Sequence, residues 1–177
     1  MRIAGTIKHS LVNGPGIRYV IFFQGCTHKC TGCHNPETHN LNGGVEVSED
    51  TVIDWITHTK HIDGVTFSGG DPLLQADSAI RIADAAHGMG LSVWCYTGYT
   101  LEQILDGQAG RPAEELLDHI ECLVDGPYIE SLRSEDCIYR GSTNQRLIYL
   151  PMEQSTQKGG TSRCFILMAK KLRPPEQ

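Results

Sequence analysis

Three cysteines lie close together in the segment 26–33, where Cys26, Cys30 and Cys33 follow the spacing C-x3-C-x2-C. Thiolates are soft ligands, and they select iron–sulfur clusters, zinc or copper(I). Three cysteines are one ligand short of a filled tetrahedral set. In a 4Fe–4S cluster, one iron would therefore stay open to a ligand from outside the protein. Such an open iron indicates chemistry at the cluster rather than simple storage of an electron.

Two simpler interpretations of this loop stay open. A zinc ion could take the three cysteines together with His28 or His34, because zinc accepts a Cys3His set. The cysteines could also be structural thiols without a metal. The spacing favours a cluster over zinc, since cysteines of zinc sites usually come as two separated pairs. We expect both histidines to lie beside the ligands or at the surface rather than to bind metal.

A second segment of chemical interest is Ser68-Gly69-Gly70-Asp71-Pro72. Paired glycines let the backbone approach a ligand closely, and a neighbouring carboxylate can pair with an ammonium group. The same residues also fit an ordinary turn that ends in an N-cap aspartate. Three further segments are rich in glycine and polar residues, at 13–18, 125–128 and 140–146.

The elements that must position these segments alternate along the chain. Short apolar runs predict strands at 19–23, 65–67, 91–96, 121–124 and 146–150. Amphipathic stretches predict helices at 51–60, 73–87, 100–106 and 113–119, with N-caps at Ser48 and Thr100 for the first and third. This alternation predicts an α/β fold with a mostly parallel sheet. The cysteine loop and the paired glycines each follow a predicted strand, so we expect them to meet at the carboxyl ends of the strands.

Length and composition limit the classes of protein that remain. The 177 residues suit one domain, which we place at 1–150. Residues 151–177 form a C-terminal extension that is either one added strand or a mobile tail. With 15 Lys and Arg against 21 Asp and Glu, the net charge of −6 argues against binding to nucleic acid. No run of 18 apolar residues is present, so we expect no membrane span. Seven cysteines without a secretory signal predict a cytoplasmic protein.

The cysteine spacing, followed by Gly-Gly-acid after the next strand, resembles the radical S-adenosylmethionine superfamily. Within it, five segments in order resemble the activating proteins of anaerobic ribonucleoside-triphosphate reductases: NGPGIR, GCTHKCTGCHNPET, SGGDPL, VDGPY and RGSTNQR. Many superfamily members carry Glu where this chain has Asp71, and an aromatic residue where it has Gly32. The resemblance implies an incomplete (β/α) barrel with an open side that admits a polypeptide loop.

The resemblance also implies a role for each candidate residue. Cys26, Cys30 and Cys33 would hold one 4Fe–4S cluster. The residues implied to contact S-adenosylmethionine are Gly32, Cys33, His34, Gly69, Gly70 and Asp71. Those implied to line the cavity or to meet the partner are Arg18, Asp125, Arg140 and Asn144. No side chain needs to act as an acid or base, because the radical forms on the cofactor.

The implied reaction needs two protein partners. A one-electron donor such as flavodoxin or ferredoxin would reduce the cluster, and the reductase large subunit would supply the glycine that loses a hydrogen atom. Two related functions compete with this interpretation, an activase for a formate-lyase type of glycyl-radical enzyme and a radical enzyme acting on a small molecule. A non-catalytic zinc-binding adaptor is the alternative from a different class.

Overall fold

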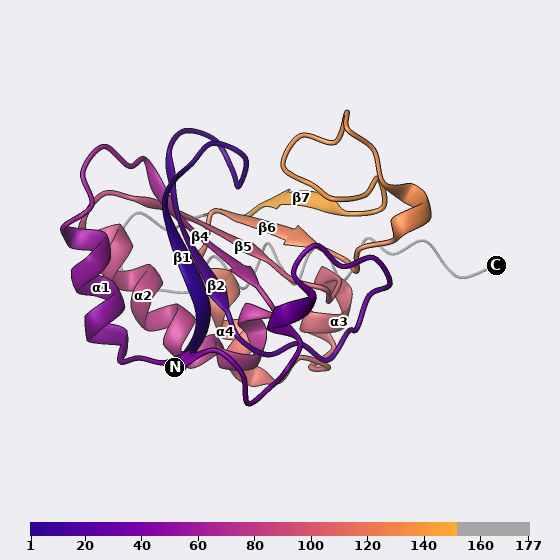
Figure 1. Ribbon diagram of the computed structural model, residues 1–177, viewed down its shortest axis with the longest axis horizontal. Coiled ribbons are helices and arrows are strands. Elements are labelled where there is room, and N and C mark those ends of the chain that lie inside the picture. Colours follow the sequence, from indigo (N-terminus) through magenta and orange to yellow (C-terminus); the bar gives the residue numbers. More distant parts are fainter. Residues whose placement is uncertain (152–177) are drawn as a thin grey trace.

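One seven-stranded sheet forms the centre of the computed structural model, which describes residues 1–151 (Figure 1). The strands lie in the order β3-β1-β2-β4-β5-β6-β7. Their bounds are β1 Arg2–Ser10, β2 Arg18–Phe23, β3 Val45–Glu46, β4 Gly64–Gly69, β5 Ser92–Tyr96, β6 Cys122–Asp125 and β7 Arg146–Tyr149. Strands β2, β4, β5 and β6 run parallel, whereas the pairs β1–β2, β1–β3 and β6–β7 are antiparallel.

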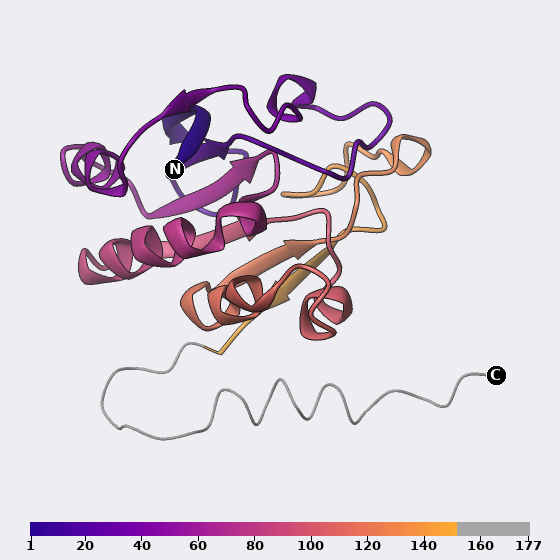
Figure 2. The ribbon, with the colours of Figure 1, turned by 90° about the horizontal axis from the view of Figure 1, so that it is seen from below.

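Four α-helices pack against one another along the sheet, α1 on α2, α2 on α4 and α4 on α3 (Figure 2). They are α1 Glu49–Thr57, α2 Ala76–Gly88, α3 Leu101–Leu105 and α4 Arg111–Leu116. Short 3-10 turns occur at η1 Pro36–Thr38, η2 Pro72–Gln75, η3 Leu117–His119 and η4 Glu130–Leu132. The expected N-caps are confirmed, because the side chains of Ser48 and Thr100 accept hydrogen bonds from backbone N–H groups of α1 and α3.

The two faces of the sheet differ in what covers them. Side chains alternate along a strand, so Phe67 and Cys95 join the apolar core that the helices share. Trp94 and Val124 lie in a separate small cluster that includes Tyr139. The face opposite the helices is approached by the loops 11–17 and 127–145, which rise above the sheet in Figure 1. In the part of the chain that the structure describes, helices therefore cover one face of the sheet and loops border the other.

The expected α/β architecture with a parallel central sheet is confirmed, and β2, β4, β5, β6 and β7 match the five predicted strands. Strand β7 is antiparallel, however, and β1 and β3 were not predicted. Four of the nine residues of β1 are exposed, and its formation depends on pairing with β2 and β3 rather than on an apolar run of its own. The helix expected at 73–87 begins instead with the 3-10 turn η2, after which α2 starts.

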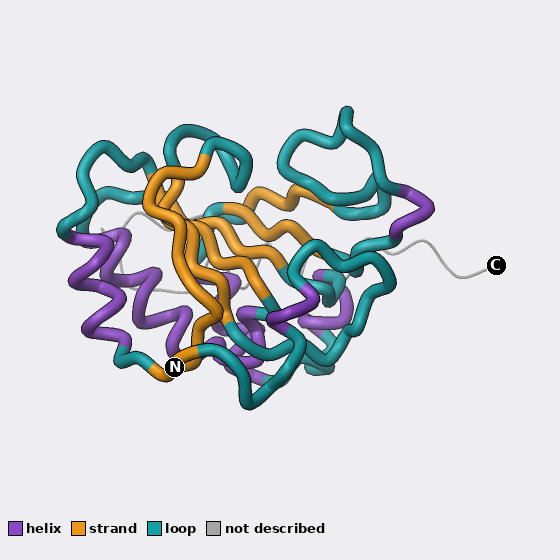
Figure 3. The backbone as a smooth tube through the Cα atoms, viewed as in Figure 1, coloured by secondary structure: helices purple, strands orange, loops and turns teal. Residues whose placement is uncertain are grey.

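The loops that follow β2 and β6 meet at the same end of the sheet (Figure 3). The expected C-terminal extension lies, from residue 152 onward, outside the described residues. Within residues 1–151, no helix is long and apolar enough to cross a membrane.

Candidate functional site

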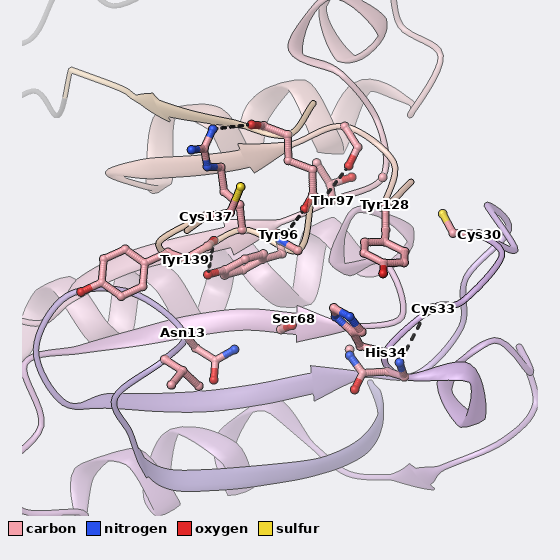
Figure 4. Close-up of a pocket in the computed structure, with 18 of the residues that line it drawn as sticks. Asn13, Cys30, Cys33, His34, Ser68, Tyr96, Thr97, Tyr128, Cys137 and Tyr139 are labelled. Atoms are coloured by element: carbon pink, nitrogen blue, oxygen red, sulfur yellow. Dashed lines mark hydrogen bonds between the residues drawn. The ribbon is translucent and has the colours of Figure 1, made fainter. Parts of the chain in front are cut away.

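A cavity of about 880 Å³ opens at the carboxyl ends of the parallel strands. Strand ends supply one part of its wall, including Phe22 of β2, Ser68 of β4 and Tyr96 of β5. The other parts come from the cysteine loop, the turn after β1 and the segment before β7 (Figure 4). This is the edge at which α/β proteins commonly bind their ligands.

All three cysteines of the motif line this cavity. Cys26, Cys30 and Cys33 are free thiols and partly exposed, and burial raises the pKa of the Cys26 thiol. The backbone N–H of Asn35 donates to Sγ of Cys33 at 3.4 Å. Within residues 1–151, no group of three His, Cys, Asp or Glu side chains is arranged to hold a metal ion. Three soft sulfur donors beside an open cavity fit a cluster that keeps one iron free of protein ligands.

The paired glycines serve two purposes in this structure. A Cβ at Gly70 would lie 2.2 Å from the carbonyl oxygen of Gly25, and one at Gly69, where φ is +98°, would lie 2.6 Å from the backbone of Phe23. The base of the cysteine loop can therefore rest on the end of β4, where Asp71 N–H donates to Gly25 O at 2.7 Å. Both glycines also line the cavity, so their backbone is within reach of a ligand.

Asp71 lies beneath the cavity rather than on its wall. The residue is fully buried, and its carboxylate accepts hydrogen bonds from the hydroxyl of Thr97 and the N–H groups of Leu73 and Gly98. His28 Nε2 lies 2.7 Å from the same carboxylate. The oxygens that were expected to pair with an ammonium group are thus occupied by donors of the protein itself.

The second half of the cysteine loop packs against the segment before β7. The ring of His34 lies 4.7 Å, centroid to centroid, from that of Tyr128. A Cβ at Gly32, where φ is +68°, would meet the Glu130 carboxyl at 2.7 Å. Cys33 and His34 line the cavity, whereas Gly32 is absent from its wall. The glycine that replaces an aromatic residue at this position therefore permits a close contact between two loops.

Arg18 does not form part of the cavity wall, because it lies fully buried at the amino ends of β2, β4 and β5. Its guanidinium donates to Thr66 Oγ1 at 3.0 Å, Val65 O at 2.6 Å and Ser92 Oγ at 2.6 Å. Burial lowers the pKa of this guanidinium. A Cβ at Gly64 would meet Arg18 Nη1 at 2.0 Å, so β4 must carry a residue without a side chain at this position.

Asp125 is likewise buried and occupied. Arg146 Nε donates to its Oδ1 at 2.9 Å, and the N–H of Leu101 donates to its Oδ2 at 2.7 Å. Arg146, to which the sequence analysis gave no role, also donates to Glu102 and lowers the pKa of that carboxyl to about 2. Together these groups join β6, β7 and α3.

Of the four residues expected at the cavity or at the partner, only Arg140 reaches the wall. Its Nη1 donates to Gln145 O at 2.9 Å, and its buried Nε has no hydrogen-bond partner among the described residues. Asn144 lies nearby but off the wall, with Nδ2 donating to Pro127 O at 2.8 Å. These bonds shape the loop that faces the cysteines.

Several wall residues were not predicted as site residues, namely Asn13, Ser68, Tyr96, Thr97, Tyr128 and Tyr139. Most of them lie at the end of a strand or in one of the segments rich in glycine and polar residues. Position at a strand end could therefore have predicted them. Tyr96 is held in place by its hydroxyl, which donates to Tyr139 O at 3.0 Å (Figure 4). Burial raises the pKa of Tyr96.

Comparisons with known proteins agree with this arrangement. The model of the 4Fe-4S single cluster domain family matches residues 12–148, a stretch that contains the three cysteines and the paired glycines. An anaerobic ribonucleoside-triphosphate reductase-activating protein of Salmonella typhimurium is 35% identical over 148 residues, which cover 79% of this chain and 93% of that protein. Proteins of the same name are 35% identical in Escherichia coli K12, over 79% of this chain and 93% of that protein, and 36% identical in Enterobacteria phage T4, over 77% and 86%.

This chain belongs to the family of anaerobic ribonucleoside-triphosphate reductase-activating proteins. The expected resemblance to these activating proteins is thereby confirmed. The match to a 4Fe-4S domain also supports an iron–sulfur cluster, rather than zinc, as the metal centre of the cysteine loop in this activating protein.

Proposed function

We propose that this chain activates an anaerobic ribonucleoside-triphosphate reductase as a radical S-adenosylmethionine enzyme. The observation that carries the proposal is the single cavity onto which the three cysteines, the backbone of Gly69 and Gly70, and His34 all open. When bound, the cluster would supply the electron that cleaves S-adenosylmethionine into methionine and a 5′-deoxyadenosyl radical, and this radical would remove a hydrogen atom from a backbone glycine of the reductase.

The protein's own residues would bind and orient the reactants. Cys26, Cys30 and Cys33 would hold the 4Fe–4S cluster, and the cavity-lining residues Gly69, Gly70 and His34 would surround the methionyl part of the cofactor. No acid or base is required, because the radical would form on the cofactor. Arg140 is the cavity-wall candidate for contact with the partner chain.

The fold supports this proposal further. Helices cover only one face of the parallel strands, and the cavity opens toward the other. We infer that the sheet is an incomplete (β/α) barrel, because a barrel keeps its helices outside and its site at the carboxyl ends. The open side would admit the glycine loop of the reductase. A cytoplasmic donor such as flavodoxin or ferredoxin would supply the electron.

The experiment is radical formation on a purified partner. Reconstituted protein, a reductant and S-adenosylmethionine are mixed anaerobically with the large subunit of the reductase, and the glycyl radical is measured by electron paramagnetic resonance. We expect a radical on the reductase and none on a formate-lyase type of enzyme. A radical only on the latter would assign the chain to the competing activase function, and a radical on neither would overturn the proposal.

A further inference from the structure

Among the described residues, one side-chain hydrogen bond connects residues 26–33 to the end of the parallel sheet, and it is made by His28. This histidine lies between Cys26 and Cys30, and its Nε2 is 2.7 Å from Oδ2 of Asp71. The carboxylate of Asp71 offers only acceptor oxygens, so Nε2 of His28 is the donor in this hydrogen bond. The side chain of Asp71 is 1% exposed and that of His28 is 18% exposed, so water has little access to this bond.

Asp71 is the junction to which several elements connect. Its Oδ1 accepts from Leu73 N–H at 3.0 Å, which fixes the turn at the start of η2. Its Oδ2 accepts from Gly98 N–H at 3.1 Å, and the hydroxyl of Thr97 reaches both oxygens at 3.1 and 2.9 Å. Together with His28, these donors use the lone pairs that a carboxylate offers. One buried carboxylate therefore joins the cysteine loop to the ends of β4 and β5.

The ring of His28 also occupies a place shaped for it. A Cβ at Gly98 would lie 2.4 Å from Cδ2 of this ring, so only a glycine there lets the ring approach. The ring also meets Tyr99 edge to face, at 4.5 Å between centroids and 76° between planes. Hydrogen bond, glycine contact and aromatic contact together fix both the distance and the orientation of the side chain.

We propose that His28 is a positioning residue, which holds the cysteine loop against the carboxyl ends of β4 and β5 through the carboxylate of Asp71. The acid of the Ser-Gly-Gly-Asp segment then orders the loop that carries the metal ligands, instead of binding the ammonium group of the cofactor. This inference rests on the proposed function, because that function makes residues 26–33 the cluster-binding loop.

The test compares four variants in two measurements. His28→Leu removes the donor, and His28→Asn keeps a polar side chain that is too short to reach Asp71. His28→Gln restores a donor of similar reach. His58→Leu is the matched control, since His58 is an exposed histidine at the end of α1.

Hydrogen exchange of the peptide 26–34 is measured in the apoprotein, and loss of cluster absorbance to an iron chelator is measured after anaerobic reconstitution. We expect both rates to rise about tenfold in His28→Leu and His28→Asn, the order of effect of losing one hydrogen bond to a charged group. His28→Gln and His58→Leu should stay near the wild type in both rates. Exchange in α2 should not change in any variant.

Wild-type rates in both His28→Leu and His28→Asn would overturn the proposal, as would an equal rise in His58→Leu. Faster exchange throughout the chain would also contradict it, because the histidine would then support the whole fold rather than the loop. If the wild-type protein bound its cluster but formed no radical on any partner, the proposed function would fail while the exchange result stood. The two failures are therefore distinguishable.

Discussion

The two ends of the parallel sheet both carry polar residues, yet they differ in how those residues are used. At the amino ends, Arg18 is fully buried and strands β4 and β5 supply acceptors for its guanidinium. At the carboxyl ends, thiols and glycine backbone border an open cavity of about 880 Å³. Polar character in a motif therefore does not identify a site. Polar groups are available to a ligand only where the protein leaves them unoccupied.

Arg18→Met has the largest expected effect. It tests the amino ends of the parallel strands, where the polar groups are buried and hydrogen-bonded. Methionine fills similar space but leaves Thr66 Oγ1, Val65 O and Ser92 O without their donor in the interior. We expect the free energy of unfolding to fall by about 3 kcal/mol, measured by urea denaturation of the apoprotein.

At a temperature where the Arg18→Met variant is folded, its production of 5′-deoxyadenosine per cluster should equal that of the wild type. An unchanged free energy of unfolding together with lost 5′-deoxyadenosine would instead place Arg18 in the active site. That outcome would break the contrast between the two ends.

Gly70→Ala tests the close approach of the backbones of Gly70 and Gly25 at the carboxyl ends of the strands, beside the cavity. Its Cβ would meet Gly25 O at 2.2 Å, so the base of the cysteine loop must move. We expect a loss of about 2 kcal/mol in the free energy of unfolding and faster loss of the cluster to a chelator.

Gly88→Ala is the matched control for Gly70→Ala, because nothing lies within 4 Å of a Cβ there and the residue ends a helix. It should be neutral or stabilise the protein by up to about 1 kcal/mol. Equal effects of the two substitutions would mean that the paired glycines do not shape the loop.

Glu102→Gln has the smallest expected effect. It concerns a carboxylate that already accepts hydrogen bonds from a side chain of the protein. Hydrogen bonds from Arg146 lower the pKa of Glu102 to about 2 in the folded state. A lowered pKa stabilises the fold above the unfolded value and loses that contribution as the pH falls toward the folded value.

Between about pH 5 and about pH 3, the wild type should therefore lose more stability than Glu102→Gln, as urea denaturation at both pH values would measure. The difference should stay below about 1 kcal/mol, because about half of each side chain is exposed. A larger loss in the variant than in the wild type would reverse the sign and contradict the assignment.

Much of this contrast could be read from the sequence, but not which charged residues belong to which end. The apolar runs predicted β2, β4, β5 and β6, because a buried strand can be recognised from the apolar residues of its own short segment. The cysteine spacing and the paired glycines could be recognised as candidate site residues in the same way, because each lies within one short segment of the sequence. The end of the sheet at which they meet followed from the rule for parallel strands.

The partners of Arg18, Asp71 and Asp125 could not be predicted in this way. Arg18 bonds to residues 47 to 74 positions away, and the bond from His28 to Asp71 spans 43 positions. The register of β2, β4 and β5 brings the partners of Arg18 together, and the register of β6 and β7 places Arg146 opposite Asp125. Strand β1 was missed for a related reason, since its pairing with β2 and β3 defines it more than its composition does.

The most direct test of the central claim, that chemistry occurs at the open end through three particular thiols, compares two cysteines of the same cavity. Cys30 lies in the motif, and Cys137 lines the cavity from the segment before β7. After anaerobic reconstitution and dithionite reduction with S-adenosylmethionine, 5′-deoxyadenosine is measured by chromatography. We predict that Cys30→Ala abolishes it while Cys137→Ala retains it. Production that survives in Cys30→Ala, or a colourless wild-type protein that binds zinc and yields none, would contradict the account.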